Sequence, residues 1–309
     1  MEKSLVIIGG ATATGKSDLA VRLAQKINGE IISADSMQIY KYMDIGTAKP
    51  TQAEQMGIKH YLIDELLPNE EYSVAVFKNM AKTALDEIYA KDKIPVVVGG
   101  TGFYINALLN DTDFTETQIN TNYRHFLYDI ALKYGSDKLH IKLREIDPQA
   151  ADEIHENNIK RVIRALEYYY LTGEKISSHN KEQLAKQSPY LYKFFTLTLP
   201  RDVLYERINQ RVDTMMEKGL EAEVRNLLNM GYYKTLTSMQ GLGYKEIVEY
   251  IEGKISLDGA VSNLKQKTRN FAKRQITWFK NKTENIPINA ADNNAVSEII
   301  SELERFFIY

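Results

Sequence analysis

Short apolar runs alternate with helical patterns along the first third of the chain. The runs have the length and composition of buried strands, and they lie at residues 4–9, 30–34, 60–63 and 94–99. Apolar residues recur at the spacing of an amphipathic helix in three further stretches, at 16–28, 74–91 and 102–109. Strands that alternate with helices predict an α/β fold whose parallel sheet is covered by helices.

The pattern changes after this first part. Residues 111–122 are polar and rich in Thr and Asn, as a linker is, and helical patterns follow at 123–133, 148–154, 159–171 and 175–187. An apolar run at 194–199, closed by Pro200, then predicts a strand that returns to the first sheet. Further helices are predicted at 201–218, 220–229, 243–252 and 256–281. We therefore expect a core domain formed by residues 1–112 and 190–309, with residues 113–189 inserted into it as a helical domain.

The clearest chemical signal follows the first predicted strand. Residues 10–17 match the phosphate-binding pattern G-x-x-x-x-G-K-S, and they lie between a strand and a helix, as the pattern requires. Glycine lets the backbone approach a phosphate, and successive N–H groups at the helix N-terminus cradle the anion. Lys16 is expected to reach the outer phosphates, and the Ser17 hydroxyl is expected to hold Mg²⁺. The expected phosphate-binding residues are Gly10, Ala11, Thr12, Ala13, Thr14, Gly15, Lys16 and Ser17.

A phosphate loop alone does not define the reaction. Most nucleotide hydrolases end a second apolar strand in an acid that helps to hold the metal, but the run at 94–99 leads into Gly100-Thr101-Gly102. Asp35 instead follows the second predicted strand, at the edge where open α/β sheets bind their ligands. A carboxylate there can bind a metal, or it can act as a base on an acceptor.

Two arginines lie one helical turn apart, just after the returning strand. Arg207 and Arg211 could each reach a bound phosphate, or they could pair with the neighbouring acids Glu206 and Asp213.

The last long helical pattern is strongly basic. From Gly259 to Thr283 it has no acid, and Lys265, Arg269 and Lys273 share one face. Because the net charge of the chain is −2, a run of one sign favours contact with nucleic-acid phosphates, although a solvated helix face has the same pattern. A second basic cluster, Lys160, Arg161 and Arg164, lies on the helix predicted at 159–171.

Composition excludes several classes of site. Cysteine is absent, which excludes disulfides, iron–sulfur clusters and cysteine-ligated zinc. No stretch approaches the roughly 20 apolar residues of a membrane span, and the first residues lack the basic and apolar regions of a signal peptide. We expect a cytoplasmic protein that has no contact with a membrane and acts as a monomer.

Taken together, these motifs resemble the tRNA dimethylallyltransferase (tRNA isopentenyltransferase) family, in its bacterial form without the additional zinc finger of eukaryotic relatives. The most specific matches are Asp-Ser-x-Gln-x-Tyr at 35–40 and Lys-Arg-Gln-x-Thr-Trp at 273–278. Tyr61 departs from the family pattern, in which we expect a histidine. The matching segments run in order along the chain, at 9–17, 35–40, 46–50, 60–64, 99–104, 161–167, 211–213, 241–245 and 273–279.

The resemblance implies transfer of the dimethylallyl group of dimethylallyl diphosphate to N6 of the adenosine just 3′ of the tRNA anticodon, with release of diphosphate. It implies that Asp35 is the base for the N6 proton, that Thr101 is a positioning hydroxyl and that Arg211 binds the diphosphate with residues 10–17. A diphosphate leaving group would also explain a phosphate loop without an ATPase acid. Magnesium at Ser17 would help to stabilise the charge that develops on it.

The resemblance also implies that the anticodon stem-loop binds near these groups. The adenine must leave the stack of its loop to reach a buried site, and in the family the residues that match Ser36 and Gln38 touch the flipped base and its neighbours. We expect the following residues to contact tRNA: Asp35, Ser36, Met37, Gln38, Thr101, Arg124, Ile159, Lys160, Arg161, Val162, Ile163, Gln240, Gly241, Leu242, Gly243, Tyr244 and Lys245. The basic helix is expected to add Lys265, Arg269, Lys273 and Arg274.

Two other functions fit part of the sequence. A small-molecule kinase would use Lys16, Mg²⁺ and Asp35 to pass a phosphate from ATP to a hydroxyl, but it leaves the basic helix unexplained. A nucleotide-gated RNA-binding protein would use the basic surfaces, but it gives Asp35 and Thr101 no role.

Overall fold

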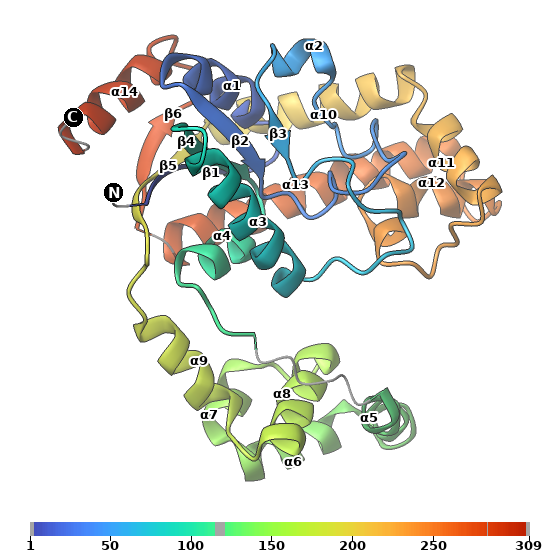
Figure 1. The fold of residues 1–309 in the computed structure, drawn as a ribbon. Coiled ribbons are helices and arrows are strands. Elements are labelled where there is room, and N and C mark those ends of the chain that lie inside the picture. The colour runs from blue at the N-terminus through green and yellow to red at the C-terminus, as the bar shows by residue number, and fades with distance from the viewer. Residues whose placement is uncertain (1–2, 115–120, 283, 307–309) are drawn as a thin grey trace. The chain divides into compact units, whose positions relative to one another are not determined.

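The computed structural model describes the chain except residues 1–2, 115–120, 283 and 307–309. Contacts divide it into two compact units (Figure 1). The core unit consists of Met1–Leu109 and Pro189–Tyr309, and the inserted unit consists of Asn110–Ser188.

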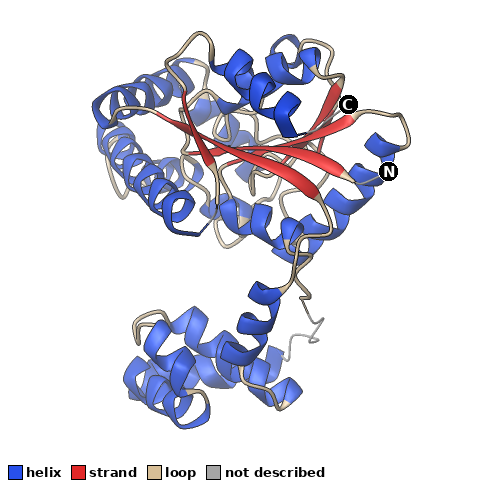
Figure 2. Cartoon of the chain, turned by 90° about the vertical axis from the view of Figure 1, so that its left-hand side faces the viewer, coloured by secondary structure: helices blue, strands red, loops and turns tan. Residues whose placement is uncertain are grey.

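The core unit is built on a parallel sheet, as the sequence predicts. In the described part of the chain it has six strands in the order β3-β2-β4-β1-β5-β6. Figure 2 shows the strands of this sheet in red. The returning strand β5 pairs in parallel with β1, from Ser4 opposite Leu191 to Gly10 opposite Leu197. The strands are β1 (Ser4–Gly10), β2 (Gly29–Ser33), β3 (His60–Tyr61), β4 (Ile94–Gly99), β5 (Leu191–Thr198) and β6 (Ile286–Asn289).

Helices cover both faces of this sheet. Alternate residues of β1 enter opposite layers: Leu5 and Ile7 pack with α3, α4, α12 and α13, whereas Val6 and Ile8 pack with α1 and α14. The helices of the core unit are α1 (Lys16–Lys26), α2 (Gln52–Gln55), α3 (Val74–Tyr89), α4 (Gly102–Leu109), α10 (Arg201–Glu217), α11 (Leu220–Asn229), α12 (Tyr244–Ile251), α13 (Leu257–Lys282) and α14 (Ala295–Phe306).

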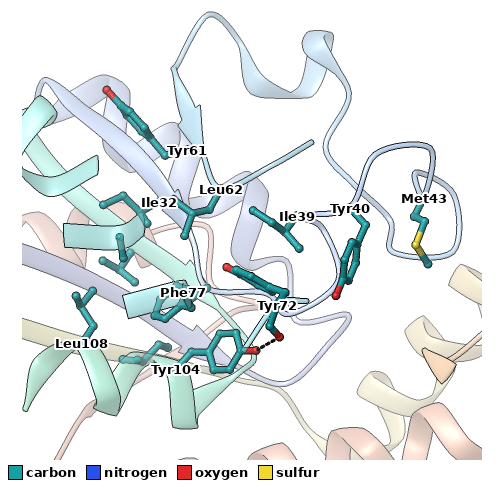
Figure 3. Packing of buried hydrophobic residues seen from close by; sticks show 14 of the residues in the cluster. Ile32, Ile39, Tyr40, Met43, Tyr61, Leu62, Tyr72, Phe77, Tyr104 and Leu108 are labelled. Atoms are coloured by element: carbon teal, nitrogen blue, oxygen red, sulfur yellow. Dashed lines mark hydrogen bonds between the residues drawn. The ribbon is translucent and has the colours of Figure 1, made fainter. Parts of the chain in front are cut away.

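An aromatic cluster lies in the larger of these layers, next to the segment that follows β2 (Figure 3). Tyr72 meets Tyr40 and Tyr104 edge to face, with ring centroids 6.3 and 5.7 Å apart. The Tyr104 hydroxyl donates to the Tyr72 carbonyl at 3.4 Å. Burial, with the nearby Tyr40 and Asp35, raises the pKa of Tyr104 to about 12, so this hydroxyl stays protonated and remains a donor.

The inserted unit is helical and has its own core. Its helices are α5 (Thr121–Tyr134), α6 (Ser136–Ile146), α7 (Pro148–Glu153), α8 (Ile159–Thr172) and α9 (Ile176–Ala185). Leu127, Leu143 and Leu166 are buried where α5, α6 and α8 meet. Asp147 caps α7 by accepting the Ala150 N–H, and it also accepts the N–H and hydroxyl of Ser177. One carboxylate thus joins two helices of this unit.

Candidate active site

The carboxyl ends of the central strands surround a cavity of about 440 Å³. It brings together Lys16 and Ser17 from the phosphate loop, Asp35 after β2, Thr101 after β4 and Arg211 from α10. Other predicted site residues that line it are Thr12, Ser36, Met37, Gln38, Gln240, Gly241, Leu242, Tyr244 and Arg274. Residues from six separate parts of the sequence therefore line one cavity.

The phosphate loop turns sharply between β1 and α1. Ala13 and Gly15 have left-handed backbone conformations, with φ of 64° and 89°. A Cβ at Gly10 would lie 2.8 Å from the carbonyl oxygen of Leu197, so glycine is required for the close approach to β5. The Ala11 carbonyl accepts Lys16 Nζ at 2.6 Å and Thr14 Oγ1 at 2.8 Å, which holds the lysine against the loop.

The charges around the cavity favour an anion. Burial and the neighbouring Arg211 lower the pKa of Lys16 to about 7, against the opposing pull of Asp35. Burial also lowers the pKa of Arg211, and Asp35 again opposes the shift. Two desolvated cations and one carboxylate leave an excess of positive charge, which a phosphate group would neutralise.

Backbone contacts place Asp35 next to Thr101. The Asp35 carboxylate accepts the Met37 N–H at 2.9 Å, which fixes the direction of the side chain. The Thr101 N–H donates to the Ala34 carbonyl at 3.3 Å. A Cβ at Gly99 would collide with the same carbonyl, so the glycine lets the segments after β2 and β4 meet. A carboxylate and a hydroxyl thus line the same cavity as Lys16 and Ser17, an arrangement that would suit a base and a positioning group.

Gln275 of α13 joins the phosphate loop to the segment after β4. Its Oε1 accepts the Thr12 N–H at 2.9 Å, and its Nε2 donates to the Gly100 carbonyl at 3.0 Å. Gln275 belongs to the Lys-Arg-Gln-x-Thr-Trp motif at 273–278, but the motif alone indicates no role for it. Its place in that motif was the signal that could have identified it.

A second contact missed by the sequence analysis involves Glu223 of α11. Its carboxylate accepts the backbone N–H groups of Asp44, Ile45 and Gly46 and the hydroxyl of Tyr244. No local pattern around Glu223 indicates these partners.

The basic helix α13 is partly engaged within the core unit. Lys265 pairs with Asp213 at 2.6 Å, and Arg269 donates to Asn209 at 2.6 Å, so both cations contact α10. Arg274 lines the cavity. Gly243, Lys245, Lys265, Arg269 and Lys273 are not among the residues that line it.

The predicted tRNA-contact residues of the inserted unit differ in exposure. Lys160 and Arg161 are exposed on α8, whereas Val162 and Ile163 are buried in the core of the unit. Arg124 forms two hydrogen bonds with Glu167, whose side chain is fully buried. Neutralising that carboxylate is a structural task for Arg124 in addition to any contact with RNA.

Two broader features concern metals and membranes. In the described ranges, no group of three or more His, Cys, Asp or Glu residues is arranged to hold a metal ion. The described helices also include none that is long and apolar enough to span a membrane.

Comparisons with known proteins agree over nearly the whole chain. Residues 38–282 match the family model for IPP transferase. The tRNA dimethylallyltransferase of Lachnoclostridium phytofermentans is 54% identical over 97% of this chain and 96% of its own length. The enzyme of the same name from Acetivibrio thermocellus is 52% identical over 99% of this chain and 97% of its own length.

Solved structures show the same relationship. The full-length tRNA isopentenylpyrophosphate transferase of Bacillus halodurans is 42% identical, with a TM-score of 0.73 over 99% of this chain and 96% of that one. A eukaryotic dimethylallyltransferase solved while acting on tRNA is 31% identical, with a TM-score of 0.85 over 99% of this chain and 79% of that one.

Proposed function

The chain belongs to the IPP transferase family, and we propose that it transfers the dimethylallyl group of dimethylallyl diphosphate to N6 of the adenosine on the 3′ side of the tRNA anticodon, releasing diphosphate. Relatives that match it over nearly their full length are named tRNA dimethylallyltransferase. The observation that carries the proposal is the cavity that joins the phosphate loop to Asp35 and Thr101.

The diphosphate binds at the positive end of this cavity. Backbone amides of residues 10–17 and the N-terminus of α1 cradle the anion, and Lys16 and Arg211 supply two desolvated cations. These groups interact more strongly as charge builds on the leaving group, so they favour the transition state over the bound substrate.

The residues present also fit Mg²⁺. Magnesium retains several waters and is commonly held by one or two protein oxygens together with substrate phosphates, so the lack of a cluster of acids in the described residues does not argue against it. Ser17 and Asp35 line the same cavity; the Ser17 hydroxyl would hold the ion. When bound, the ion would offset charge on the diphosphate.

Asp35 acts on the nucleophile. The N6–C1 bond of the product forms as the C1–O bond of dimethylallyl diphosphate breaks, and the bonding electrons leave with the diphosphate. The N6 proton passes to the Asp35 carboxylate, whose direction is fixed by the Met37 N–H. Thr101, held by the Ala34 carbonyl, positions the reacting groups.

The acceptor adenine enters the cavity after it leaves the stack of its loop. Ser36, Met37, Gln38 and Arg274 line the cavity and surround the base and its neighbours. Lys273, with the other cations of α13, contacts RNA phosphates. We further propose that the protein acts on tRNA in the cytoplasm and as a monomer.

A labelling experiment tests this function directly. The purified protein is incubated with unmodified tRNA and either radiolabelled dimethylallyl diphosphate or γ-labelled ATP, with and without Mg²⁺. Label from the prenyl donor should enter tRNA in a Mg²⁺-dependent manner, and nuclease digestion should recover it on the adenosine next to the anticodon. Transfer of phosphate from ATP to a small alcohol would overturn the proposal in favour of a kinase. Binding of tRNA without transfer of label would overturn it in favour of an RNA-binding protein.

A further inference from the structure

The segment between Gln38 and Pro50 has a backbone that needs external support. Tyr42 and Ala48 have φ of 67° and 46°, a conformation that residues with a side chain rarely adopt. Lys49 provides one support, since its buried ammonium group donates to the Tyr40 carbonyl and pairs with Asp44 and Asp64.

Glu223 provides a second support, from a different part of the chain. One carboxylate oxygen accepts the N–H groups of Asp44 and Ile45 at 2.9 and 2.7 Å. The other accepts the Gly46 N–H at 3.0 Å and the Tyr244 hydroxyl at 2.7 Å. Three successive amides that point at one carboxylate form a concave anion site, so the charge of Glu223 fixes the backbone there.

Tyr244 packs against Gly46 and donates a hydrogen bond to the same carboxylate. Its ring is fully buried, and a Cβ at Gly46 would lie 2.6 Å from it. Burial and the neighbouring Glu223 raise the pKa of Tyr244, so its hydroxyl stays a donor to the carboxylate.

Thr47 and Ala48, which follow Gly46 in the segment, determine how the Gln38 side-chain amide is oriented. Its Nε2 lies 3.4 and 3.3 Å from the carbonyl oxygens of Thr47 and Ala48. A carbonyl can only accept, so the nitrogen must face the segment and not the oxygen. Gln38 Oε1 accepts the Ser33 hydroxyl at 3.2 Å and keeps a second lone pair.

We propose that Glu223 is a specificity-determining positioning residue: by holding residues 44–46 it fixes the carbonyls that orient the Gln38 amide, so that Gln38 offers an acceptor to the 6-amino group of adenine. This inference rests on the proposed function. Adenine carries a donor at position 6, whereas the 6-oxo group of inosine is an acceptor. An amide fixed in this orientation therefore favours adenosine and disfavours inosine.

The test compares two anticodon stem-loops that differ only in adenosine or inosine at the acceptor position. Competition binding gives their affinity ratio for the native protein, for Glu223→Gln and for Glu221→Gln. Glu221 is the matched control, because it lies on the same helix and pairs with Arg225. The native protein and the control should prefer adenosine by roughly tenfold, within the range for one base-specific contact.

Glu223→Gln should reduce this preference to about threefold or less, because the NH₂ group of the new glutamine cannot accept hydrogen bonds from the backbone N–H groups. With the adenosine stem-loop its KM should rise severalfold, while the KM for dimethylallyl diphosphate changes little. In a Gln38→Met background the same substitution should leave the ratio unchanged. A further fall of the ratio in that background would show that Glu223 does not act through Gln38.

The outcomes separate the two proposals. If the native protein transfers label and prefers adenosine but Glu223→Gln retains the full preference, the positioning role is wrong and the proposed function stands. If the native protein neither transfers label nor distinguishes the stem-loops, the proposed function itself fails. Should Glu223→Gln not fold, Tyr244→Phe removes one donor to the same carboxylate and keeps the ring, and it should reduce the preference about twofold; an unchanged ratio would contradict the inference.

Discussion

Thr12 and Gln275 are hydrogen-bonded although they lie 263 positions apart: the backbone N–H of the phosphate-loop residue donates to the side-chain carbonyl of the helix residue at 2.9 Å. The same side-chain amide reaches the Gly100 carbonyl. One side chain of α13 therefore links the phosphate loop to the segment that carries Thr101.

Replacing Gln275 with Leu should destabilise the fold and the site together. Each polar group left without its partner costs about 1–3 kcal/mol when buried, and both contacts here are partly buried. The free energy of unfolding in urea should fall by about 2 kcal/mol or more. The affinity for inorganic diphosphate should fall as well, because the loop is less well ordered.

Gln266→Leu is the control for this change, because Gln266 is an exposed glutamine on the same helix. It should leave both measurements near those of the native protein. Equal urea midpoints for Gln275→Leu and Gln266→Leu would show that the bridge contributes nothing to stability.

Lys16 should make diphosphate binding depend on pH near neutrality. Its pKa is lowered from 10.5 to about 7, and a bound anion favours the protonated form. The affinity for diphosphate should therefore weaken as the pH rises above about 7. Lys16→Arg keeps its positive charge across this range and is the reference. Because diphosphate itself titrates equally in both measurements, the ratio of the native to the variant dissociation constant reports only the titration of Lys16. A ratio that stays constant between pH 6 and 9 would contradict the assignment.

The same shift has a definite sign for stability. Between pH 7 and 10.5 the unfolded chain binds a proton at Lys16 that the folded chain does not, so this group alone makes stability rise with pH. Its destabilising effect is complete below pH 7 and absent above 10.5. Urea midpoints for the native protein and Lys16→Met should differ most at pH 6 and converge towards pH 10, with Lys16→Met the more stable at the lower pH.

Asp35→Asn should reduce the rate of transfer with little effect on the fold. Asparagine keeps the acceptor for the Met37 N–H but cannot take up the N6 proton. Single-turnover rates should fall by roughly 10²–10⁴, the usual contribution of a positioned base. The affinity for tRNA should change much less. A variant that retains near-native single-turnover rates would remove Asp35 from the role of base.

The contiguous parts of this site could be predicted from the sequence. The phosphate loop is an eight-residue pattern whose strand and helix lie beside it, and Asp35 follows a recognisable strand. The returning strand β5 could be predicted because its apolar, β-branched and aromatic composition differs from that of the helices around it. Each of these signals is local in the chain.

Other parts of the fold and of the site were not predicted from the sequence, for different reasons. The edge strand β6 has four residues and contains Pro287, too little for a pattern. The contacts of Gln275 and Glu223 join side chains to backbone amides far away in the chain, and backbone groups carry no sequence signal. Helix α14 could have been predicted, since Ala295, Ile299 and Leu303 recur every four residues.

The role of the basic helix α13 is best tested by comparing a variant of Lys273 alone with a variant that also changes Lys265 and Arg269. Lys265 pairs with Asp213 and Arg269 donates to Asn209, so replacing them also removes contacts with α10. Lys273→Gln is therefore the cleaner variant, and the triple change of Lys265, Arg269 and Lys273 to Gln is the stronger one. A partly exposed ion pair and one hydrogen bond each contribute about 1 kcal/mol to folding, so both variants should fold.

If this helix binds RNA phosphates, the affinity for every tRNA should fall alike in both variants, because phosphate contacts carry no sequence information. The slope of log affinity against log salt concentration should become shallower by about 0.7–0.9 for each phosphate that the variant no longer neutralises. Lys26→Gln is the control, since it removes the same charge from α1, on the opposite face of the sheet. A solvated helix face predicts that all these curves coincide with that of the native protein, and such a result would exclude α13 from the RNA-binding surface.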